Sequence, residues 1–263
     1  MIPQADIARW RTQVPWVSAE NVEQDLILSR LIVEIAQHPL LGSGLVFRGG
    51  TCLHKLWFDR PWRYSEDLDY VRPSTGGVGG ILNGVREIAE SVGFDDVRTA
   101  IGMHHKVRLR ARFESGGPFH IKVEINTFEG SPARPAVTKE YVVDSPWFRG
   151  VAEIPTFCAP ELIATKIRAL YQRRKGRDLF DLWLAVNHLG IDPAEIAACF
   201  ATYRPDGWTV ALAIDNLDQK IENPEFVADL APLVAEWPAG YSIDAGHAVA
   251  EAVIHAIEAL DGS

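Results

Sequence analysis

In the first third of the chain, segments with the hydrophobic spacing of a helix are followed by segments with the pattern of a strand. Residues 21–37 carry apolar side chains every three or four positions, the spacing of an amphipathic helix. A short apolar strand at 44–47 leads into two glycines and a second predicted helix that continues to Trp57. Alternation then predicts a strand over 64–71, and residues 81–92 return to the amphipathic helical spacing.

The middle of the chain predicts a hairpin, and the last third predicts helices. Apolar and polar residues alternate over 105–113 and again over 119–126, with the turn residues Gly116 and Gly117 between them. After Pro155 the spacing becomes helical. The helices expected there are 160–173, 177–189, 192–202, 207–220 and 247–260.

This order of elements predicts an α+β protein with two domains, a mixed β-sheet domain with flanking helices over 1–150 and a helical domain over 151–263. Charge divides in a similar way: residues 1–177 hold 24 Lys and Arg against 20 Asp and Glu, whereas residues 178–263 hold 2 against 15. The net charge of −9 therefore does not exclude a nucleic-acid partner, because binding follows local patches.

Composition points to a cytoplasmic protein without a membrane partner. No apolar run reaches the ~18 residues of a membrane span, and the N-terminus lacks the apolar core of a secretory signal. The three cysteines lie far apart without metal-binding spacing. That pattern argues against a thiolate zinc site and against a disulfide scaffold.

Candidate chemistry centres on two short motifs. Gly49, Gly50 and Thr51 lie between a predicted strand and a predicted helix, where glycine lets the backbone approach a phosphate and the helix N-terminus can bind it. Asp67 and Asp69 lie two apart on the next strand, so their carboxylates leave the same face. The alternative is a simple turn followed by a solvated strand edge. The order strand, turn, helix, strand favours a nucleotide site.

A third strand carboxylate, Glu124, has apolar neighbours on both sides and could complete a cluster with Asp67 and Asp69. Three converging carboxylates repel each other unless a cation neutralises them. Oxygen ligands alone select Mg²⁺ or Mn²⁺. Metal ions held in this way clamp a triphosphate and stabilise the leaving pyrophosphate.

The predicted helix 160–173 carries Lys166 within its apolar arc. An ammonium group in that position needs an anionic partner. In the next helix Asp178 lies within the apolar arc and Asp181 beside it. Two interpretations remain open: an internal Lys–Asp pair that joins two helices, or a functional set. In the second, Lys166 binds the triphosphate while Asp178 or Asp181 orients a basic group or helps to activate the acceptor.

Taken together, segments 47–51, 63–69 and 161–182 resemble the AbiEii/AbiGii (MenT-like) nucleotidyltransferase toxin family, within the DNA polymerase β-like superfamily. The resemblance spans roughly residues 20–190. It implies a nucleotidyltransferase lobe followed by a helical lobe, and Mg²⁺-dependent transfer of NMP from an NTP. In several members the acceptor is the 3′ end of tRNA, and this modification blocks translation. The resemblance also implies a bacterial toxin–antitoxin system with a cognate antitoxin protein.

The family motifs fall on particular residues of this chain. Gly49 and Thr51 match the phosphate-binding turn, Ser65 and Asp67 match a Ser-x-Asp element, and Asp69 is the metal-binding partner of Asp67. Further matches are Lys166 with the essential lysine and Asp181 with the second Asp of an Arg-Asp-x-x-Asp motif. Arg48 stands where lysine is more usual, which keeps the charge but changes the geometry. The nucleotide-binding set that the resemblance implies is Arg48, Gly49, Gly50, Thr51, Ser65, Lys166, Arg177 and Asp178.

A basic strand face supports an RNA acceptor. Four like charges on one face repel each other unless an anion lies across them. These candidate RNA-binding residues are Lys106, Arg108, Arg110 and Arg112. The alternative interpretation is a solvated face.

Two rival functions remain open. One is a nucleotidyltransferase that acts on a protein side chain or a small molecule. The other is a nucleotide-binding regulatory module without turnover.

Overall fold

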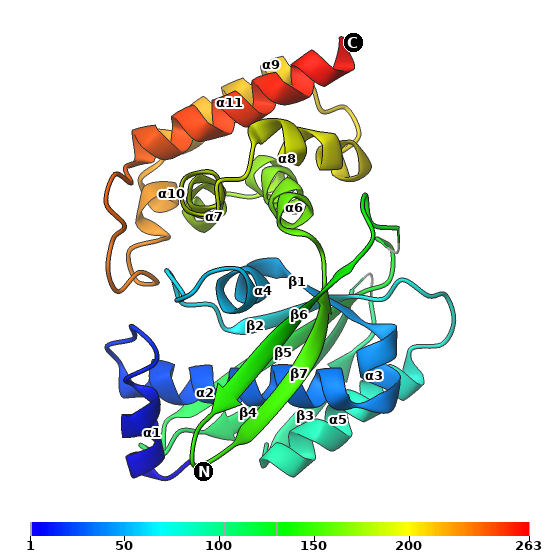
Figure 1. Ribbon diagram of the computed structural model, residues 1–263, viewed down its shortest axis with the longest axis vertical. Coiled ribbons are helices and arrows are strands. Elements are labelled where there is room, and N and C mark those ends of the chain that lie inside the picture. Colours follow the sequence, from blue (N-terminus) through cyan, green and yellow to red (C-terminus); the bar gives the residue numbers. More distant parts are fainter. Residues whose placement is uncertain (1, 103, 130, 263) are drawn as a thin grey trace. The chain divides into compact units, whose positions relative to one another are not determined.

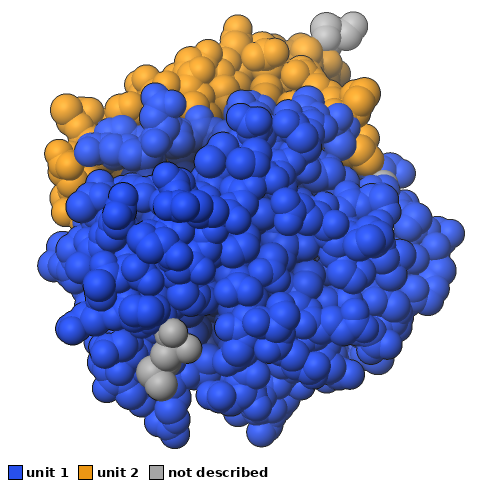
Figure 2. Space-filling model, turned by 60° about the horizontal axis from the view of Figure 1, so that its bottom comes forward, with its two compact units in different colours: residues 1–131, 136–157 blue, residues 132–135, 158–263 orange. Residues whose placement is uncertain are grey.

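The computed structural model describes residues 2–102, 104–129 and 131–262. The chain folds into two compact units, which Figure 2 shows in different colours. Unit 1 comprises residues 1–131 and 136–157, and unit 2 comprises residues 132–135 and 158–263. The sequence-based division after residue 150 falls inside the last strand of unit 1, β7 (Arg149–Thr156).

Among its described residues, unit 1 contains a seven-stranded mixed sheet and five helices (Figure 1). Helices α2 and α5 pack against the sheet. The helices are α1 (Gln4–Trp10), α2 (Ala19–Gln37), α3 (Pro39–Gly44), α4 (Gly49–Leu56) and α5 (Gly79–Val92). The other strands are β1 (Val46–Arg48), β2 (Asp67–Val71), β3 (Asp96–Ala100), β4 (His105–Arg112), β5 (Pro118–Asn126) and β6 (Val137–Asp144).

The strand order is β3-β4-β5-β2-β1-β7-β6. Strand β1 pairs antiparallel with β2 and parallel with β7, and β2 pairs parallel with β5. Strand β1 precedes the Gly-Gly turn and helix α4, and strand β2 follows that helix in the sequence. Both are therefore central strands of the sheet. Strands β3, β6 and β7 have no counterpart among the predicted elements, whereas the mixed α+β architecture is confirmed.

Helix α4 is anchored on α2 by a buried ion pair. Lys55 Nζ lies 2.7 Å from Asp25 Oδ1, and the same carboxylate accepts hydrogen bonds from the indoles of Trp10 (2.8 Å) and Trp16 (2.9 Å). Burial alone would lower the pKa of Lys55, but the charge of Asp25 raises it above the usual value. A carboxylate satisfied by three donors holds α4, and with it the turn at its N-terminus, in a fixed position.

Unit 2 is helical, as the spacing after Pro155 predicts. Its helix α11 begins at Ile243, ahead of the predicted start at residue 247. The elements are α6 (Ala159–Gln172), α7 (Gly176–His188), α8 (Pro193–Phe200), the 3₁₀ turn η1 (Ala201–Tyr203), α9 (Val210–Ile221), α10 (Pro224–Ala228) and α11 (Ile243–Asp261).

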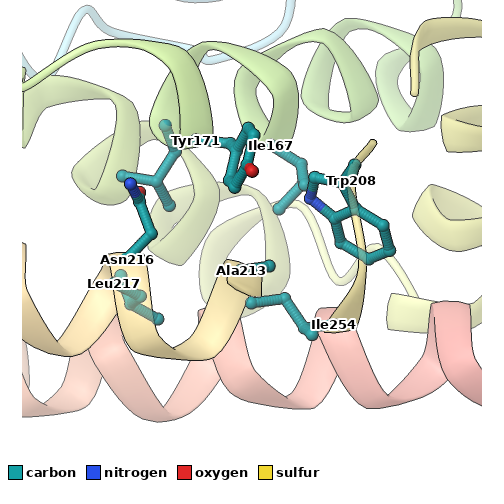
Figure 3. A pocket seen from close by; sticks show the side chains of 8 residues that line it. Ile167, Tyr171, Trp208, Ala213, Asn216, Leu217 and Ile254 are labelled. Carbon is teal, nitrogen blue, oxygen red and sulfur yellow. The ribbon is translucent and has the colours of Figure 1, made fainter. Parts of the chain in front are cut away.

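A small cavity lies inside unit 2, among side chains of α6, α9 and α11 (Figure 3). Its volume of about 10 Å³ has room for a single water molecule. The indole N–H of Trp208, which lines it, has no hydrogen-bond partner among the described residues. A cavity of this size is too small for a nucleotide or another organic ligand, so it is a packing feature.

None of the helices in residues 2–102, 104–129 and 131–262 is both long and apolar enough to cross a lipid bilayer.

Candidate active site

The turn between β1 and α4 requires glycine at its first position. Gly49 has a φ of +84°, and a Cβ added there would lie 2.4 Å from Asp69 Oδ2. A Cβ on Gly50 would lie 2.5 Å from the guanidinium of Arg63. The absence of side chains therefore lets strand β2 and a buried arginine come directly against the start of α4. Sequence reasoning missed Arg63 as a contact of the turn.

Thr51 joins the turn to strand β2. Its hydroxyl lies 2.8 Å from Ser65 Oγ and donates to the main-chain carbonyl of Asp67. Thr51 is 1% exposed. The structure therefore brings Thr51, Ser65 and Asp67 together, and the threonine hydroxyl positions the strand that carries the carboxylates.

The three predicted metal ligands lie on one face of two neighbouring strands. Asp67 and Asp69 are both on β2, and Glu124 is the register partner of Asp69 on β5. All three side chains therefore leave the same face of the sheet, while Leu68 and Val123 between them point into the core.

A lysine that was not among the predicted site residues lies inside this cluster. Lys122 Nζ is 2.9 Å from Asp67 Oδ2 and 3.5 Å from Glu124 Oε2. Burial alone would lower the pKa of Lys122, but the hydrogen bond to Asp67 and the surrounding carboxylates raise it. The ammonium thus acts as a counter-charge for the cluster.

The charges of the cluster act on Asp69. Burial and the neighbouring carboxylate of Asp67 raise the pKa of Asp69 above its usual value, while Arg48 and Lys122 act in the opposite direction. Arg48 itself forms an ion pair with Glu129 across the end of β1. The negative charges of these carboxylates repel one another and so oppose ionisation of Asp69. A divalent cation bound to them would neutralise this repulsion.

A row of lysine and arginine side chains extends across the strands of the sheet, starting beside the carboxylates. Asp67 lies opposite Lys122, Lys122 lies opposite Arg108, and Arg108 lies opposite Arg98 on strand β3. The next row along the strands places Lys106 opposite Glu124, at 3.4 Å. The face with the metal-binding candidates is therefore continuous with a basic face.

The remaining two predicted RNA-binding residues lie further along β4. Arg110 and Arg112 are exposed and leave the same face as Arg108. Arg110 lies 3.7 Å from Asp96, whose carboxylate also pairs with Arg98. One carboxylate thus offsets part of this charge, and the face keeps a net positive balance.

In unit 2, the structure brings Lys166, Asp178 and Asp181 together. Lys166 Nζ lies 3.2 Å from Asp178 Oδ1 and 2.9 Å from Asp181 Oδ2, and both aspartates are fully buried. Arg173 contacts Asp178 through two nitrogens, at 2.7 and 2.8 Å. Burial would raise the pKa of Asp178, but Lys166 and Arg173 lower it.

This cluster has the geometry that either interpretation of Lys166 requires. Two cations and two carboxylates join α6 to α7 as an internal network, and the same contacts fix the direction of the lysine. Arg177, the remaining predicted nucleotide contact, is half-buried at the start of α7. Its main-chain N–H lies 3.5 Å from Asp229.

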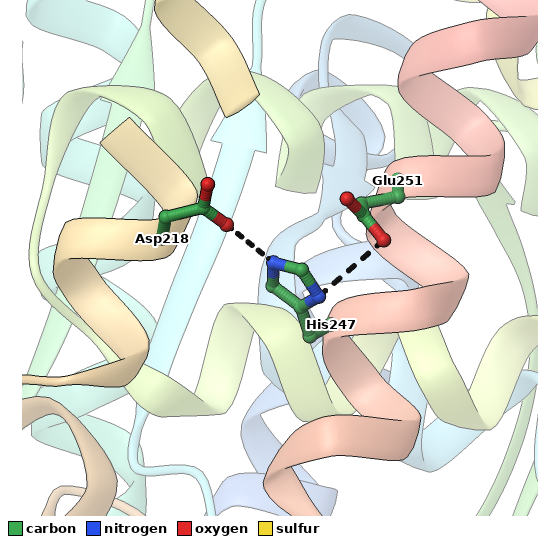
Figure 4. A group of neighbouring side chains, drawn as sticks. All are labelled: Asp218, His247 and Glu251. Atoms are coloured by element: carbon green, nitrogen blue, oxygen red, sulfur yellow. Dashed lines mark hydrogen bonds and ion pairs between the residues drawn. The ribbon is translucent and has the colours of Figure 1, made fainter. Parts of the chain in front are cut away.

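A further group outside the predicted set could hold a metal ion. His247 bridges α9 and α11, with Nε2 at 2.7 Å from Asp218 and Nδ1 at 3.5 Å from Glu251 (Figure 4). One ligand atom from each residue lies within 4.8 Å of the others. The i, i+4 spacing of His247 and Glu251 on one helix is a signal that the sequence contained.

Comparisons with known proteins identify the family of the chain. The family described as nucleotidyl transferase AbiEii toxin, type IV TA system, matches residues 30–252. A search of curated proteins returns no significant match.

Two solved structures show the fold. MenT4, a nucleotidyltransferase toxin from Mycobacterium tuberculosis H37Rv, is similar with a TM-score of 0.61 and 19% identity, over 98% of this chain and 90% of that one. JHP933 from Helicobacter pylori is similar with a TM-score of 0.58 and 15% identity, over 94% and 96%.

The family match covers most of the chain, including the Gly-Gly turn, the strand carboxylates and the Lys166 cluster. Membership of this family implies an NTP substrate and a cognate antitoxin. The chain belongs to the AbiEii family and is a nucleotidyltransferase toxin of a type IV toxin–antitoxin system.

Proposed function

We propose that this toxin transfers NMP from an NTP to an RNA acceptor in a Mg²⁺-dependent reaction, with the 3′ end of tRNA as the target, and so blocks translation. The observation that carries the proposal is the continuous sheet face on which Asp67, Asp69 and Glu124 adjoin a row of cations. A nucleotidyltransferase must hold a metal–triphosphate complex beside the end of its acceptor, and a polyanionic acceptor needs positive charge next to the metal ligands.

The donor set fits a hard divalent cation. Asp67, Asp69 and Glu124 offer only carboxylate oxygens, which suit Mg²⁺ and Mn²⁺. Bound Mg²⁺ supplies charge neutralisation for the triphosphate and its pyrophosphate leaving group. Lys122 keeps the carboxylates compensated in the absence of the ion, because its ammonium already pairs with Asp67.

The residues of the turn and of the Lys166 cluster fit a role in triphosphate binding. The main-chain N–H groups at the N-terminus of α4 are the kind of donors that bind phosphate oxygens, and Arg48 adds charge at the same end. Asp178 and Asp181 position the ammonium of Lys166, the residue to which the family resemblance gives a role in triphosphate binding. Direct action of Asp181 on the acceptor hydroxyl stays a prediction.

The basic face supports an RNA acceptor over a small molecule. Arg98 and Arg108 extend the positive charge by two strands beyond Lys122, much further than a small acceptor needs. Such a face binds backbone phosphates and makes the affinity dependent on salt. Recognition of an acceptor stem would rest on its shape, phosphates and 2′-hydroxyls.

The test is to incubate the purified protein with bacterial total RNA, Mg²⁺ and each α-labelled NTP in turn. We expect one labelled band at the size of tRNA, which disappears with Asp67→Ala. The matched control is Asp144→Asn, which removes an exposed carboxylate from strand β6 and leaves labelling intact. Label on protein or on a small molecule in whole lysate, with none on RNA, would refute the proposed acceptor. Binding of NTP without pyrophosphate release would refute turnover.

A further inference from the structure

A histidine of the last helix lies between two carboxylates in unit 2 (Figure 4). His247 is on α11, one turn before Glu251 on the same helix, and Asp218 comes from α9. Nε2 of the imidazole lies 2.7 Å from Asp218 Oδ1, and Nδ1 lies 3.5 Å from Glu251 Oε2. Each ring nitrogen of His247 therefore faces a carboxylate oxygen.

The two contacts of this imidazole differ in length. The 2.7 Å separation at Nε2 is that of a hydrogen bond, which the ring N–H donates to Asp218. A neutral imidazole carries a single N–H, so Nδ1 then presents its lone pair to Glu251. At 3.5 Å the second contact is too long for a good hydrogen bond. It brings a lone pair and a carboxylate oxygen together, and a cation between the two atoms would remove their repulsion.

The separation of Nδ1 and Glu251 Oε2 suits two ligands of one metal ion. Zn²⁺ binds nitrogen and oxygen at about 2.0–2.2 Å, so two ligands in a tetrahedral site lie about 3.3–3.5 Å apart. The hydrogen bond from Nε2 to Asp218 is the kind of contact that fixes the ring of a metal-binding histidine. Glu251 is half-buried and Asp218 is exposed, so water can reach the ion and complete its coordination.

The charge of the surrounding chain favours a cation at this position. Residues 178–263 hold 2 Lys and Arg against 15 Asp and Glu. Arg204 forms an ion pair with Asp261 at 2.9 Å, and Lys220 donates to main-chain carbonyls of α6. Both basic residues of this segment are therefore engaged away from the histidine. The negative potential of the segment raises the local concentration of divalent cations.

We propose that His247 and Glu251 bind a divalent transition-metal ion of the Zn²⁺ type, and that Asp218 orients the imidazole for it. The nitrogen ligand selects against Mg²⁺, which prefers oxygen ligands, so this site takes a different metal from the carboxylates of strands β2 and β5. A metal ion on Nδ1 makes the Nε2–H a stronger donor to Asp218, 29 residues away in the sequence. The ion thereby stabilises the packing of α11 on α9.

The experiment measures Zn²⁺ binding to the full-length protein by isothermal titration calorimetry, in a buffer with excess Mg²⁺ that keeps oxygen-only sites filled. Wild-type protein should bind Zn²⁺ and melt at a higher temperature in its presence, since an ion that binds only the folded state stabilises it. His247→Gln and Glu251→Gln should each abolish this rise in melting temperature, because each removes a ligand. Asp218→Asn should weaken the Zn²⁺ affinity by about 10–100-fold, the usual effect of losing the partner of a metal-binding histidine.

The matched control is His255→Gln on the same helix. His255 Nδ1 lies 3.2 Å from Glu258, and both side chains are exposed. Among the described residues, this pair does not belong to a group of three metal-binding side chains. His255→Gln should therefore leave both the Zn²⁺ affinity and the rise in melting temperature unchanged. This control separates the site at His247 from ordinary binding of Zn²⁺ to a helical histidine beside a glutamate.

Three results would overturn the proposal. They are wild-type protein that does not bind Zn²⁺, equal losses of affinity in His247→Gln and His255→Gln, and an unchanged affinity in Glu251→Gln. The first result would show that a protonated imidazole bonds both carboxylates without a metal ion. The substitutions keep the size of each side chain or nearly so, and circular dichroism confirms that each variant is folded. None of these measurements depends on nucleotidyl transfer.

Discussion

Gly49→Ala tests whether the contact between the turn and strand β2 sets the position of the metal-binding carboxylate. The substitution forces alanine into a φ of +84°, which costs about 1–2 kcal/mol for a residue with a Cβ. Its new methyl group would also lie 2.4 Å from Asp69 Oδ2, so the carboxylate or the start of α4 must shift. Overpacking of this kind adds about 1–3 kcal/mol. The expected total is about 2–5 kcal/mol, with displacement of a metal-binding candidate.

The matched control is Gly116→Ala in the β4–β5 hairpin. Gly116 has nearly the same φ, +89°, but nothing lies within 4 Å of its added Cβ. Only the backbone cost of about 1–2 kcal/mol applies there. Melting temperatures should fall by about 2–4 °C for each kcal/mol in a chain of this size. Transfer of label from NTP should fall at least about 100-fold in Gly49→Ala, since displacement by about 1 Å is sufficient, and should persist in Gly116→Ala.

Equal activity of the two variants would refute this reasoning, because the difference between them isolates the contact with Asp69. Equal losses of stability would show that the start of α4 relaxes freely around the added methyl group.

Three other predictions follow from contacts described above. Asp69→Asn should raise the stability of the metal-free protein at neutral pH, since the native pKa of Asp69 lies above its unfolded value and ionisation therefore costs stability. This gain in stability should disappear as the pH falls from the raised pKa of Asp69 to the usual aspartate range. Thermal melts in which the gain does not change with pH would contradict the raised pKa as its cause. Glu161→Gln should destabilise unit 2 by about 1–3 kcal/mol in urea, because the buried carboxylate accepts from two main-chain N–H groups and from Tyr203; an unchanged midpoint would show that the amide replaces it. Arg108→Glu should weaken RNA labelling and its dependence on salt, whereas Arg149→Glu, an exposed charge on β7, should not. Equal losses in both arginine variants would indicate a nonspecific charge effect.

The elements around the candidate site could be predicted from the sequence because their patterns are local. The glycines before α4, the i, i+2 aspartates of β2 and the alternation of β5 are each visible within one short stretch of chain. The position of Glu124 follows from that alternation, and the structure places it beside Asp69. The family itself was also accessible from motif spacing.

Lys122 could not be found in the same way. It contacts Asp67 because β2 and β5, which are far apart in the sequence, pair in parallel, and no local pattern gives the register of two distant strands. Strands β6 and β7 were missed for a related reason. Their exposed faces carry Val142 and Val151, so the apolar and polar positions do not alternate clearly.

The strand order also affects when the toxin can become active during its own synthesis. The turn and the aspartates are complete once Val71 has been made, but β1 and β2 are central strands whose outer neighbours β7 and β5 are made later. The sheet cannot enclose them until Thr156 has been added. At elongation rates of about 5–20 residues per second, the roughly 85 further residues take about 4–17 s. The nascent chain therefore carries its candidate catalytic residues in an unformed state while it is still attached to the ribosome.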